Sequence, residues 1–298
     1  GCARLVRALG IGATLVIMER FGAEEALATI ERERITVAGL VPTMLRMMLP
    51  ALRAKPAACA SLRVVIVTTE AFPVPLKQEL ASLLPQAQLF SLLGSSEAFV
   101  TSLTHREQIT HAASVGCPVP GVEVRLVDEA DRDVPPGEVG EIVLRHGAPG
   151  SGAVMRGYFG DPQATAAAFR NGWFHTGDMA RADADGYLYV VDRKKDMVLS
   201  GGYNIYSKEV EAAIHAHPAV QDVAVIGVPD AVFGEAVAAF VELKPGATAD
   251  AAAIIEGCRD RIAGYKKPKH VRFVDALPRN ATGKVQKFRL REMFSEEG

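Results

Sequence analysis

Short apolar runs that alternate with helical patterns constrain the fold of the first third of this chain. Four of them have the length of buried strands, at residues 14–18, 35–40, 63–67 and 88–92. Residues 24–34 and 76–84 are predicted as helices between these runs. Strands bridged by helices predict a parallel sheet with right-handed crossovers, covered on both faces.

The pattern changes from Ser114 onward. The expected strands span residues 122–127, 140–144 and 187–191, and their side chains alternate or run apolar. Turn sequences such as Asp185-Gly186 separate them. This pattern predicts antiparallel pairing in a small barrel-like or distorted sheet. After Arg193 a small α+β unit is expected. Its helices are residues 207–215, with Ser207 as N-cap, and 249–262, and its strands are 220–228, 236–243 and 271–274, before a tail over 282–294.

The predicted fold class is therefore α/β, with a helix-covered parallel sheet, a small antiparallel barrel-like subdomain and a small α+β domain at the C-terminal end. We place the three parts at residues 1–113, 114–194 and 195–298. A length of 298 residues suits about two domains, so the first two parts are expected to form one larger body.

Composition narrows the function. The chain is 49% hydrophobic and carries a net charge of −2, so it has no basic excess to neutralise nucleic acid phosphates. Lysines gather only near the C-terminal end, where they suit a phosphorylated small molecule (Lys266, Lys267, Lys269, Lys284 and Lys287). No apolar run reaches the roughly 18 residues of a membrane span, and we find no signal peptide.

The cysteines and the first residues complete this picture. The four cysteines show neither metal-binding nor redox spacing, so we expect reduced thiols in a cytoplasmic protein (Cys2, Cys59, Cys117 and Cys258). The chain begins Gly-Cys rather than Met inside an α/β pattern. We therefore expect a fragment of a longer protein.

Residues 172–206 carry the densest chemistry. Asp178 stands in a Gly turn, Arg193 follows a strand, and Gly201-Gly202 forms a flexible pair. A nucleotide ribose needs a carboxylate to accept from its hydroxyls and a fixed cation nearby, and a moving domain needs a short polar joint. Taken singly, an Asp in a β-turn and a solvated charge run are the commoner explanations.

Two further turns have suitable groups. Ser95, Ser96 and Glu97 follow Gly94 at the end of a predicted buried strand, where hydroxyls can bind phosphate and a carboxylate can hold Mg²⁺; a helix N-cap is the simpler alternative. Near the C-terminal end, Gly283 frees the backbone beside Lys284, whose ammonium is a point charge on a flexible stem. An exposed lysine in a loop is again the simpler alternative.

Five blocks in order resemble the adenylate-forming superfamily, which includes acyl-CoA synthetases, firefly-type luciferases and the adenylation domains of peptide synthetases. The blocks are residues 93–97, 152–158, 173–178, 192–206 and 278–284. The resemblance implies a ligase that first joins a carboxylate to the α-phosphate of ATP and then, after its C-terminal domain rotates, passes the acyl group to a thiol.

The resemblance also implies a role for each matching residue. Glu97 would bind Mg²⁺, and Lys284 would stabilise the charge that develops as the adenylate forms. The nucleotide would contact Ser95, Ser96, Asp178, Arg193 and Lys284. Lys195 occupies the hinge position of the C-terminal domain, which is expected to be mobile. Coenzyme A would contact Gly201, Gly202, Phe233, Tyr265 and Lys267, and the acyl pocket would be lined by Thr43, Glu70, Ala71, Leu93 and Gly94.

The chain also departs from the family pattern. Leu93 stands where an aromatic usually stacks on adenine, Ser96 replaces the usual Thr, and residues 68–71 read Thr-Thr-Glu-Ala where a Gly-rich pair is common. The family's Ser/Thr/Gly-rich phosphate loop, which is expected upstream of the five blocks, has no match in this sequence. We therefore expect the 298 residues alone to turn over poorly, whereas the full-length protein would be active.

Three functions stay open. The first is an acyl-CoA ligase for an aromatic or a medium-to-long aliphatic acid, using ATP, Mg²⁺ and coenzyme A. The second is a stand-alone domain that loads a carrier protein, and the third is a non-catalytic nucleotide-binding remnant. The acid and the oligomeric state are open as well, with a homodimer as one candidate.

Overall fold

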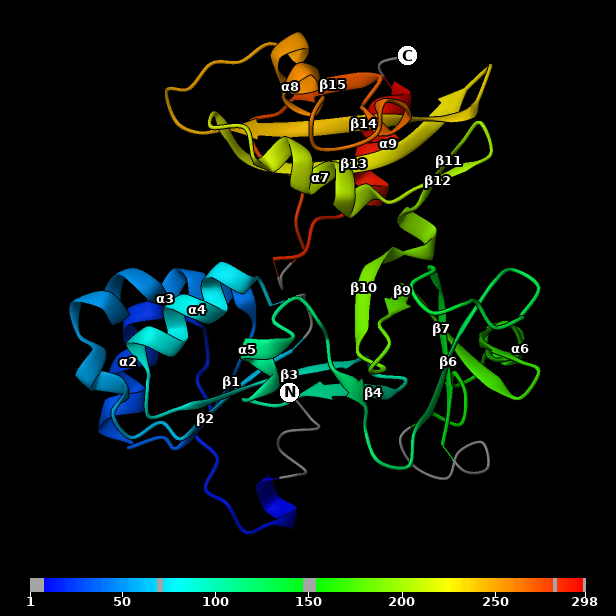
Figure 1. Ribbon diagram of the computed structural model, residues 1–298. Coiled ribbons are helices and arrows are strands. Elements are labelled where there is room, and N and C mark those ends of the chain that lie inside the picture. Colours follow the sequence, from blue (N-terminus) through cyan, green and yellow to red (C-terminus); the bar gives the residue numbers. More distant parts are fainter. Residues whose placement is uncertain (1–7, 69–71, 147–153, 281–282, 297–298) are drawn as a thin grey trace. The chain divides into compact units, whose positions relative to one another are not determined.

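The computed structural model describes residues 8–68, 72–146, 154–280 and 283–296 (Figure 1). The chain forms two compact units. The first comprises Gly1–Glu123 with His146–Gly157, and the second comprises Val124–Arg145 with Tyr158–Gly298. The predicted boundaries at residues 113/114 and 194/195 stay predictions.

The first unit is built on a five-stranded sheet in sequential order. Its strands are β1 (Val37–Leu40), β2 (Val64–Val67), β3 (Gln88–Gly94), β4 (Phe99–Leu103) and β5 (Cys117–Pro118). The pairs β1–β2 and β2–β3 are parallel, as predicted, whereas β4 and β5 add antiparallel pairs. The helices of this unit are α2 (Ala23–Arg32), α3 (Pro42–Ala54), α4 (Val74–Leu83) and α5 (Glu107–Thr110), with a 3₁₀ turn at Pro56–Cys59.

Two further features of this unit differ from the sequence prediction. The apolar run at residues 14–18 is not a strand, and its side chains at Leu15, Val16 and Ile17 are exposed. Helix α3 was not predicted. Pro42 at its first position favours a helix start, but Pro50 inside it breaks the pattern that a helix usually shows.

The second unit begins with an open sheet. Its strand order is β10 (Leu188–Arg193), β9 (Trp173–Ala182), β7 (Gly140–Arg145) and β6 (Glu123–Val127), with β8 (Phe169–Arg170) beside β9 and α6 (Pro162–Ala168) preceding it. The pairs of β9 with β7, β8 and β10 are antiparallel, as predicted. No closed barrel forms among the strands that the structure describes.

The remaining part of the second unit is the predicted α+β fold. Its sheet runs β12 (Tyr203–Ile205), β11 (Val198–Ser200), β14 (Gly234–Leu243) and β13 (Val220–Asp230), and β15 (His270–Phe273) pairs parallel with β14. Its helices are α7 (Ser207–His215), α8 (Ala251–Gly257) and α9 (Lys287–Glu296), with 3₁₀ turns at Lys194–Asp196 and Gly264–Lys266. Figure 1 shows α7 and α9 beside the long yellow strands β13 and β14.

Alternation along β13 explains why this sheet is covered on both faces. Val223 and Val225 pack in one core with Ile214 of α7, whereas Ala224 and Ile226 pack in another with residues of α9. Successive side chains of a strand point to opposite faces, so a continuous apolar run fills two cores. The prediction of Ser207 as an N-cap is wrong: helix α7 starts at Ser207 itself, and the hydroxyl of this buried residue accepts a hydrogen bond from Lys287 Nζ at 2.6 Å.

Within the described ranges, no helix is long and apolar enough to span a membrane. Among the cysteines that the structure describes, Cys59 and Cys258 are buried free thiols.

Candidate nucleotide-binding site

The turn at Thr176-Gly177-Asp178 interrupts the ladder between β9 and β7. His175 pairs with Val143 and Met179 pairs with Glu141, so three residues of β9 face a single residue of β7. Gly177 has a φ of 71°, a value that favours glycine. The Thr176 hydroxyl fixes the turn, because it donates to the Ile142 carbonyl at 2.8 Å and accepts from the Asp178 amide at 3.0 Å.

Asp178 and Arg193 form an ion pair across strands β9 and β10. They are direct partners in the register of these strands, and Arg193 Nε lies 2.8 Å from Asp178 Oδ1. A second guanidinium nitrogen of Arg193 donates to the Thr176 carbonyl at 3.1 Å. The Asp178 side chain is 16% exposed and that of Arg193 45%, so the carboxylate is fixed while the cation still faces solvent.

Three cations counteract the effect of burial on the pKa of the Asp178 carboxyl. Burial raises the pKa of Asp178, and the charges of Arg193, Lys208 and Lys284 act against that rise. Lys284 belongs to the same compact unit as Asp178, and its charge lowers the pKa of that carboxyl. The predicted ribose pair and the predicted catalytic lysine are therefore brought into one electrostatic neighbourhood.

Lys284 stands on a tight loop with its side chain exposed. Arg279 and Val285 pair across the loop, and the Asn280 side chain accepts from the Lys284 amide at 3.0 Å. Gly283, whose φ is 84°, donates to the Asn280 carbonyl at 2.9 Å. The loop thus holds the backbone of Lys284 and leaves its long side chain at the surface.

The predicted hinge residue, Lys195, is exposed and lies in the 3₁₀ turn after β10. Its carbonyl accepts from Arg291 of α9 at 3.3 Å, and the neighbouring Asp196 pairs with Arg291 at 3.6 Å. Helix α9 therefore contacts the turn about which rotation is predicted.

The residues predicted to contact coenzyme A lie around the β11–β12 hairpin. Gly201 and Gly202 have φ values of 57° and 82°, as its two-residue turn requires. The Gly201 amide donates to the Phe233 carbonyl at 2.9 Å, and the Tyr265 ring stacks near Tyr203 with 4.7 Å between centroids. These three rings are more than half exposed, and half-buried Lys267 follows two residues after Tyr265.

In the first unit, the turn after β3 is held together by Ser95. Its hydroxyl accepts from the Glu97 amide at 3.1 Å and the Ala98 amide at 3.3 Å. The alternative of a helix N-cap is wrong, because strand β4 and not a helix follows this turn. Ser96 is exposed and Glu97 is half-buried. A Cβ on Gly94 would lie 2.9 Å from the Ala98 carbonyl oxygen, so the turn needs glycine there.

Magnesium would find one carboxylate in this turn. The described residues contain no group of three or more His, Cys, Asp and Glu side chains that could hold a metal. Mg²⁺ is usually held through one or two carboxylates, substrate phosphates and several waters, so a single half-buried Glu97 suits an ion that arrives with the nucleotide.

The predicted acyl pocket is only partly visible. Thr43 is half-buried in the first turn of α3, and Leu93 and Gly94 end β3. Glu70 and Ala71 lie outside the described residues. The pocket therefore stays a prediction.

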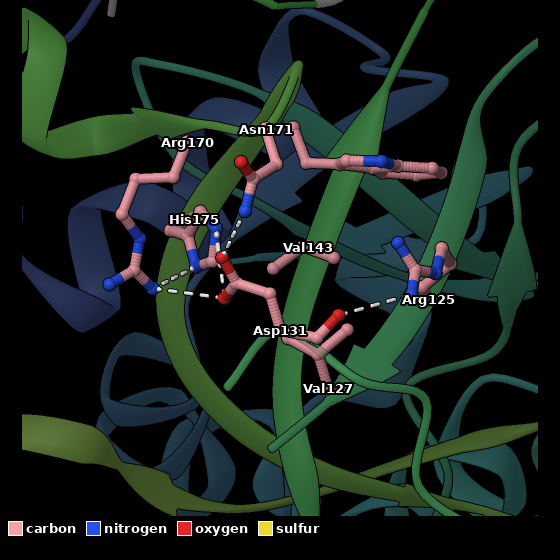
Figure 2. Close-up of a pocket in the computed structure, with 8 residues that line it drawn as sticks. Arg125, Val127, Asp131, Val143, Arg170, Asn171 and His175 are labelled. Atoms are coloured by element: carbon pink, nitrogen blue, oxygen red, sulfur yellow. Dashed lines mark hydrogen bonds and ion pairs between the residues drawn. The ribbon is translucent and has the colours of Figure 1, made fainter. Parts of the chain in front are cut away.

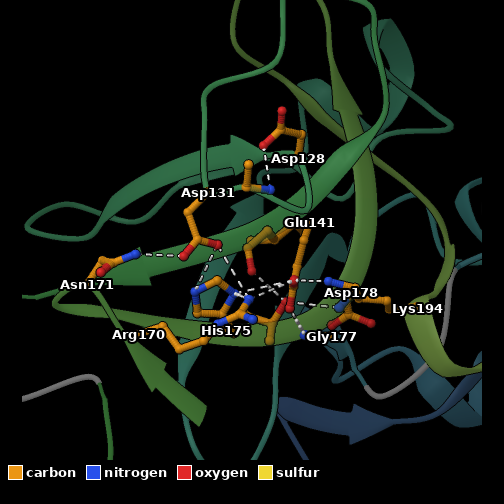
Figure 3. A network of polar contacts seen from close by, with 12 residues as sticks. Asp128, Asp131, Glu141, Arg170, Asn171, His175, Gly177, Asp178 and Lys194 are labelled. Carbon is orange, nitrogen blue, oxygen red and sulfur yellow. Dashed lines mark hydrogen bonds and ion pairs between the residues drawn. The ribbon is translucent and has the colours of Figure 1, made fainter. Parts of the chain in front are cut away.

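Sequence reasoning missed a polar network beside the Asp178 turn, shown in Figure 3. Glu141 of β7 lies at its centre and contacts Gly177, His175 and Lys194. One signal was present in the sequence: Glu141 is the second residue of an apolar strand in which all residues but the last are buried. A carboxylate at a buried strand position must find partners.

A small surface cavity adjoins this network (Figure 2). Asp131 lies at its wall and accepts from Asn171 Nδ2 at 2.7 Å, while Arg170 pairs with the same carboxylate at 3.4 Å. Its lining also includes Trp173, whose ring carries the Arg125 guanidinium 5.1 Å from its centroid. The polar groups of this cavity are thus bonded to one another and stabilise the sheet.

Three sheets with helices and antiparallel extensions define a mixed α/β protein. The family model "AMP-binding enzyme" matches residues 1–159, and "AMP-binding enzyme C-terminal domain" matches residues 209–284. The chain belongs to this family of adenylate-forming enzymes, as the five blocks predicted.

Curated relatives include an indoleacetate–CoA ligase from Aromatoleum aromaticum, 39% identical over 97% of this chain and 56% of the relative. A feruloyl-CoA synthase from an Amycolatopsis species is 40% identical over 95% of this chain and 57% of the relative. The chain thus spans a little over half the length of these relatives.

Solved structures show the same likeness. ATP-bound MatB from Rhodopseudomonas palustris matches with a TM-score of 0.85 and 34% identity, over 96% of this chain and 56% of the other. The o-succinylbenzoate CoA synthetase of Bacillus subtilis, in complex with its acyl-adenylate intermediate, matches with a TM-score of 0.85 and 31% identity, over 99% of this chain and 58% of the other.

Proposed function

We propose that this chain supplies the ribose-binding turn, the catalytic lysine and the thiol-step surface of an ATP-dependent acyl-CoA ligase. The single observation that carries the proposal is the Asp178–Arg193 pair, joined at 2.8 Å beside a glycine turn. A fixed carboxylate accepts from ribose hydroxyls, and the neighbouring guanidinium donates to ring or phosphate oxygens. Charge from Lys284 reaches the same place.

The proposed reaction has two steps. In the first, a carboxylate oxygen attacks the α-phosphorus of ATP, a P–O bond forms, and pyrophosphate leaves with the electrons of the broken P–O bond. In the second, a thiol attacks the acyl carbonyl, AMP leaves, and the thiol proton passes to solvent. Positioning and electrostatic stabilisation account for most of the catalysis in such phosphorus chemistry.

Each proposed residue has a place in the first step. Asp178 and Arg193 would hold the ribose, and Ser95 and Ser96 are the residues proposed for the phosphates. Lys284 stabilises the charge that develops on the phosphate. Glu97 would hold Mg²⁺, and the ion would neutralise part of the charge on the nucleotide phosphates.

The second step uses the aromatic surface around the β11–β12 hairpin. Gly201 and Gly202 allow close approach of a pantetheine chain, and Phe233, Tyr265 and Lys267 provide contacts for the nucleotide end of coenzyme A. Rotation about Lys195 would move Lys284 away from the nucleotide pocket and bring this surface to it. One pocket would then serve the transition states of both steps.

The relatives guide the choice of acid. They are named for indoleacetate, ferulate and long-chain fatty acids. An aromatic or a medium-to-long aliphatic carboxylate is therefore the proposed substrate class for the full-length protein. A cytoplasmic location and a homodimer stay predictions.

A pyrophosphate-release screen tests the proposal. The full-length protein that contains this chain is given ATP, Mg²⁺ and single acids from both classes, first with coenzyme A and then with holo-carrier proteins as acceptors. We expect acid-dependent pyrophosphate release and a CoA thioester, both lost with Asp178→Ala. If the thioester forms only on a carrier protein, the acceptor is the carrier and not CoA. Nucleotide binding without turnover of any acid would contradict the ligase function.

A further inference from the structure

Glu141 is a buried carboxylate that the proposed chemistry does not use. It is 4% exposed and is the last residue of β7 that pairs with β9 before the interrupted part of the ladder. Burial would raise its pKa, yet hydrogen bonds from Lys194 and His175 and their charges bring the pKa of Glu141 below its ordinary value. The carboxylate is therefore ionised and costs free energy unless its partners stay in place.

The two oxygens of Glu141 bind different segments of the chain. Oε1 accepts from the Gly177 amide at 3.2 Å, and Oε2 accepts from Lys194 Nζ at 2.8 Å. Gly177 directly precedes Asp178, and Lys194 directly follows Arg193. One side chain thus contacts the chain neighbour of each member of the ribose pair, as Figure 3 shows.

Further polar side chains surround the Glu141 carboxylate. His175, whose side chain is buried, has its Nδ1 atom 3.3 Å from Glu141 Oε2 and its Nε2 atom 3.7 Å from Asp131. Arg170 lies 2.8 Å from the same Nδ1 atom and 3.8 Å from Glu141. The Glu141 side chain therefore has little freedom to follow a displaced Gly177 or Lys194.

We propose that Glu141 is the positioning residue of the Asp178–Arg193 pair, aligning carboxylate and guanidinium for the nucleotide through its bonds to Gly177 and Lys194. This inference rests on the proposed function, because it assigns a nucleotide to that pair. Glu141 itself contacts neither reacting atoms nor ribose. Its effect is to keep two backbone segments, 36 and 53 residues away from it in sequence, in one register.

A matched control exists in the same unit. Glu211 also accepts from one backbone amide, that of Val225 at 2.9 Å, and pairs with one lysine, Lys287 at 2.7 Å. It contacts neither neighbour of the ribose pair. Glu211→Gln therefore removes the same kind of charge from the same kind of bonds, and separates loss of stability from loss of alignment.

The test measures ATP affinity by calorimetric titration, and KM for ATP and kcat for pyrophosphate release, in the full-length protein. Glu141→Gln keeps an acceptor for Gly177 but loses the charge for Lys194, so we expect about tenfold weaker ATP binding and a raised KM. Glu141→Ala should weaken binding further. Glu211→Gln should lower the melting temperature comparably and leave ATP affinity within about twofold.

A double-mutant cycle provides the sharper readout. If Glu141 acts through Asp178, Glu141→Gln should change ATP affinity less than about twofold when Asp178→Asn is already present. Additive losses, or equal losses with Glu211→Gln, would overturn the inference and leave the proposed function intact. Absence of ATP binding by the unaltered protein would overturn the proposed function. If Glu141→Gln fails to fold, Lys194→Met takes its place in the cycle.

Discussion

Lys77 offers a quantitative test of the first unit. It is 3% exposed on α4, its Nζ donates to the Ala112 carbonyl at 2.6 Å, and it lies 5.4 Å from the centroid of the Phe72 ring. Burial lowers the pKa of Lys77 from 10.5 to about 8. At neutral pH the folded protein therefore holds a charged ammonium that its surroundings disfavour.

The magnitude follows from linkage. A fall from 10.5 to about 8 corresponds, at about 1.36 kcal/mol per pH unit, to about 3 kcal/mol that the charged lysine costs the folded state. Between these pKa values the unfolded chain binds more protons, so stability rises with pH. From pH 7 to pH 9.5 the expected gain is about 2 kcal/mol.

Lys77→Met removes the titration and keeps most of the side-chain length. At pH 7 the variant escapes the cost of the charge but leaves the Ala112 carbonyl without its donor, a loss of about 1–3 kcal/mol. The two effects partly cancel at neutral pH. Above pH 9 the unaltered protein keeps the bond from a neutral amine, so the variant should be clearly less stable.

Alkylation of two buried cysteines measures the opening of the two units separately. Cys59 packs in the same core as Leu76 and Leu80, whereas Cys258 is buried in the second unit. Burial raises the pKa of Cys59 to about 11, so alkylation there should follow opening of the first unit. The Cys59 labelling rate of the unaltered protein, divided by that of Lys77→Met, should fall about thirtyfold from pH 7 to pH 9.5.

The Cys258 ratio is the internal control and should stay near one at every pH, because Lys77 lies in the other unit. Parallel labelling curves at Cys59 for the two proteins would refute the reasoning. They would mean that Lys77 titrates as if it were exposed.

Three more outcomes are expected. Because burial raises the pKa of Asp178, kcat/KM for ATP should fall as pH is lowered, beginning at a higher pH than for an ordinary aspartate, and Asp178→Asn should lack this phase in its pH profile. Lys284→Ala should slow adenylation about 100-fold or more while thioester formation from a supplied acyl-adenylate changes little, and an equal loss in both half-reactions would contradict the divided roles. Gly201→Ala and Gly202→Ala should each lower stability by about 1 kcal/mol, because both positions have positive φ. A Cβ at Gly201 would also lie 3.2 Å from the Phe233 ring, whereas one at Gly202 meets nothing within 4 Å, so Gly201→Ala should raise KM for coenzyme A more than Gly202→Ala.

Local patterns predicted most of the regular elements. The runs at 63–67 and 88–92 became β2 and the first part of β3, and the helix at 207–215 was predicted with both its bounds. In these segments, apolar side chains repeat with the period of the element that buries them. The C-terminal sheet succeeded for the same reason, because β13 and β14 are apolar on both faces.

Three strands that carry proposed site residues could not be predicted this way. β9 contains the polar side chains of His175, Thr176 and Asp178, and Gly177 with its positive φ, and these residues interrupt strand alternation. β11 and β12 have only three residues each, and a glycine pair separates them. The residues to which the proposed function assigns a ligand do not follow the alternation of apolar and polar side chains, so their strands cannot be recognised from that pattern.

Glu141 shows a second limit of sequence reasoning. Its partners Gly177 and Lys194 lie 36 and 53 residues further along the chain, beyond any local window. The blocks of the superfamily identified Asp178 and Arg193 but gave no reason why these two side chains meet. Only the register of β9 with β7 and β10 supplies that reason.

The irregularities around the ribose pair have one physical cause. The ladder shifts between Glu141 and Val143 on one side of β9, and between Val190 and Asp192 on the strand at its other side. Shifts of this kind turn side chains out of the pleat and leave backbone groups without ladder partners. Glu141 accepts from one such group, the Gly177 amide, and the Thr176 hydroxyl accepts from another, the Asp178 amide. The buried Glu141 carboxylate is thus a consequence of the turn that presents Asp178. Without Glu141 the Gly177 amide should lack a hydrogen-bond acceptor, and without the turn the Glu141 carboxylate should lack a donor, so either change should lower stability.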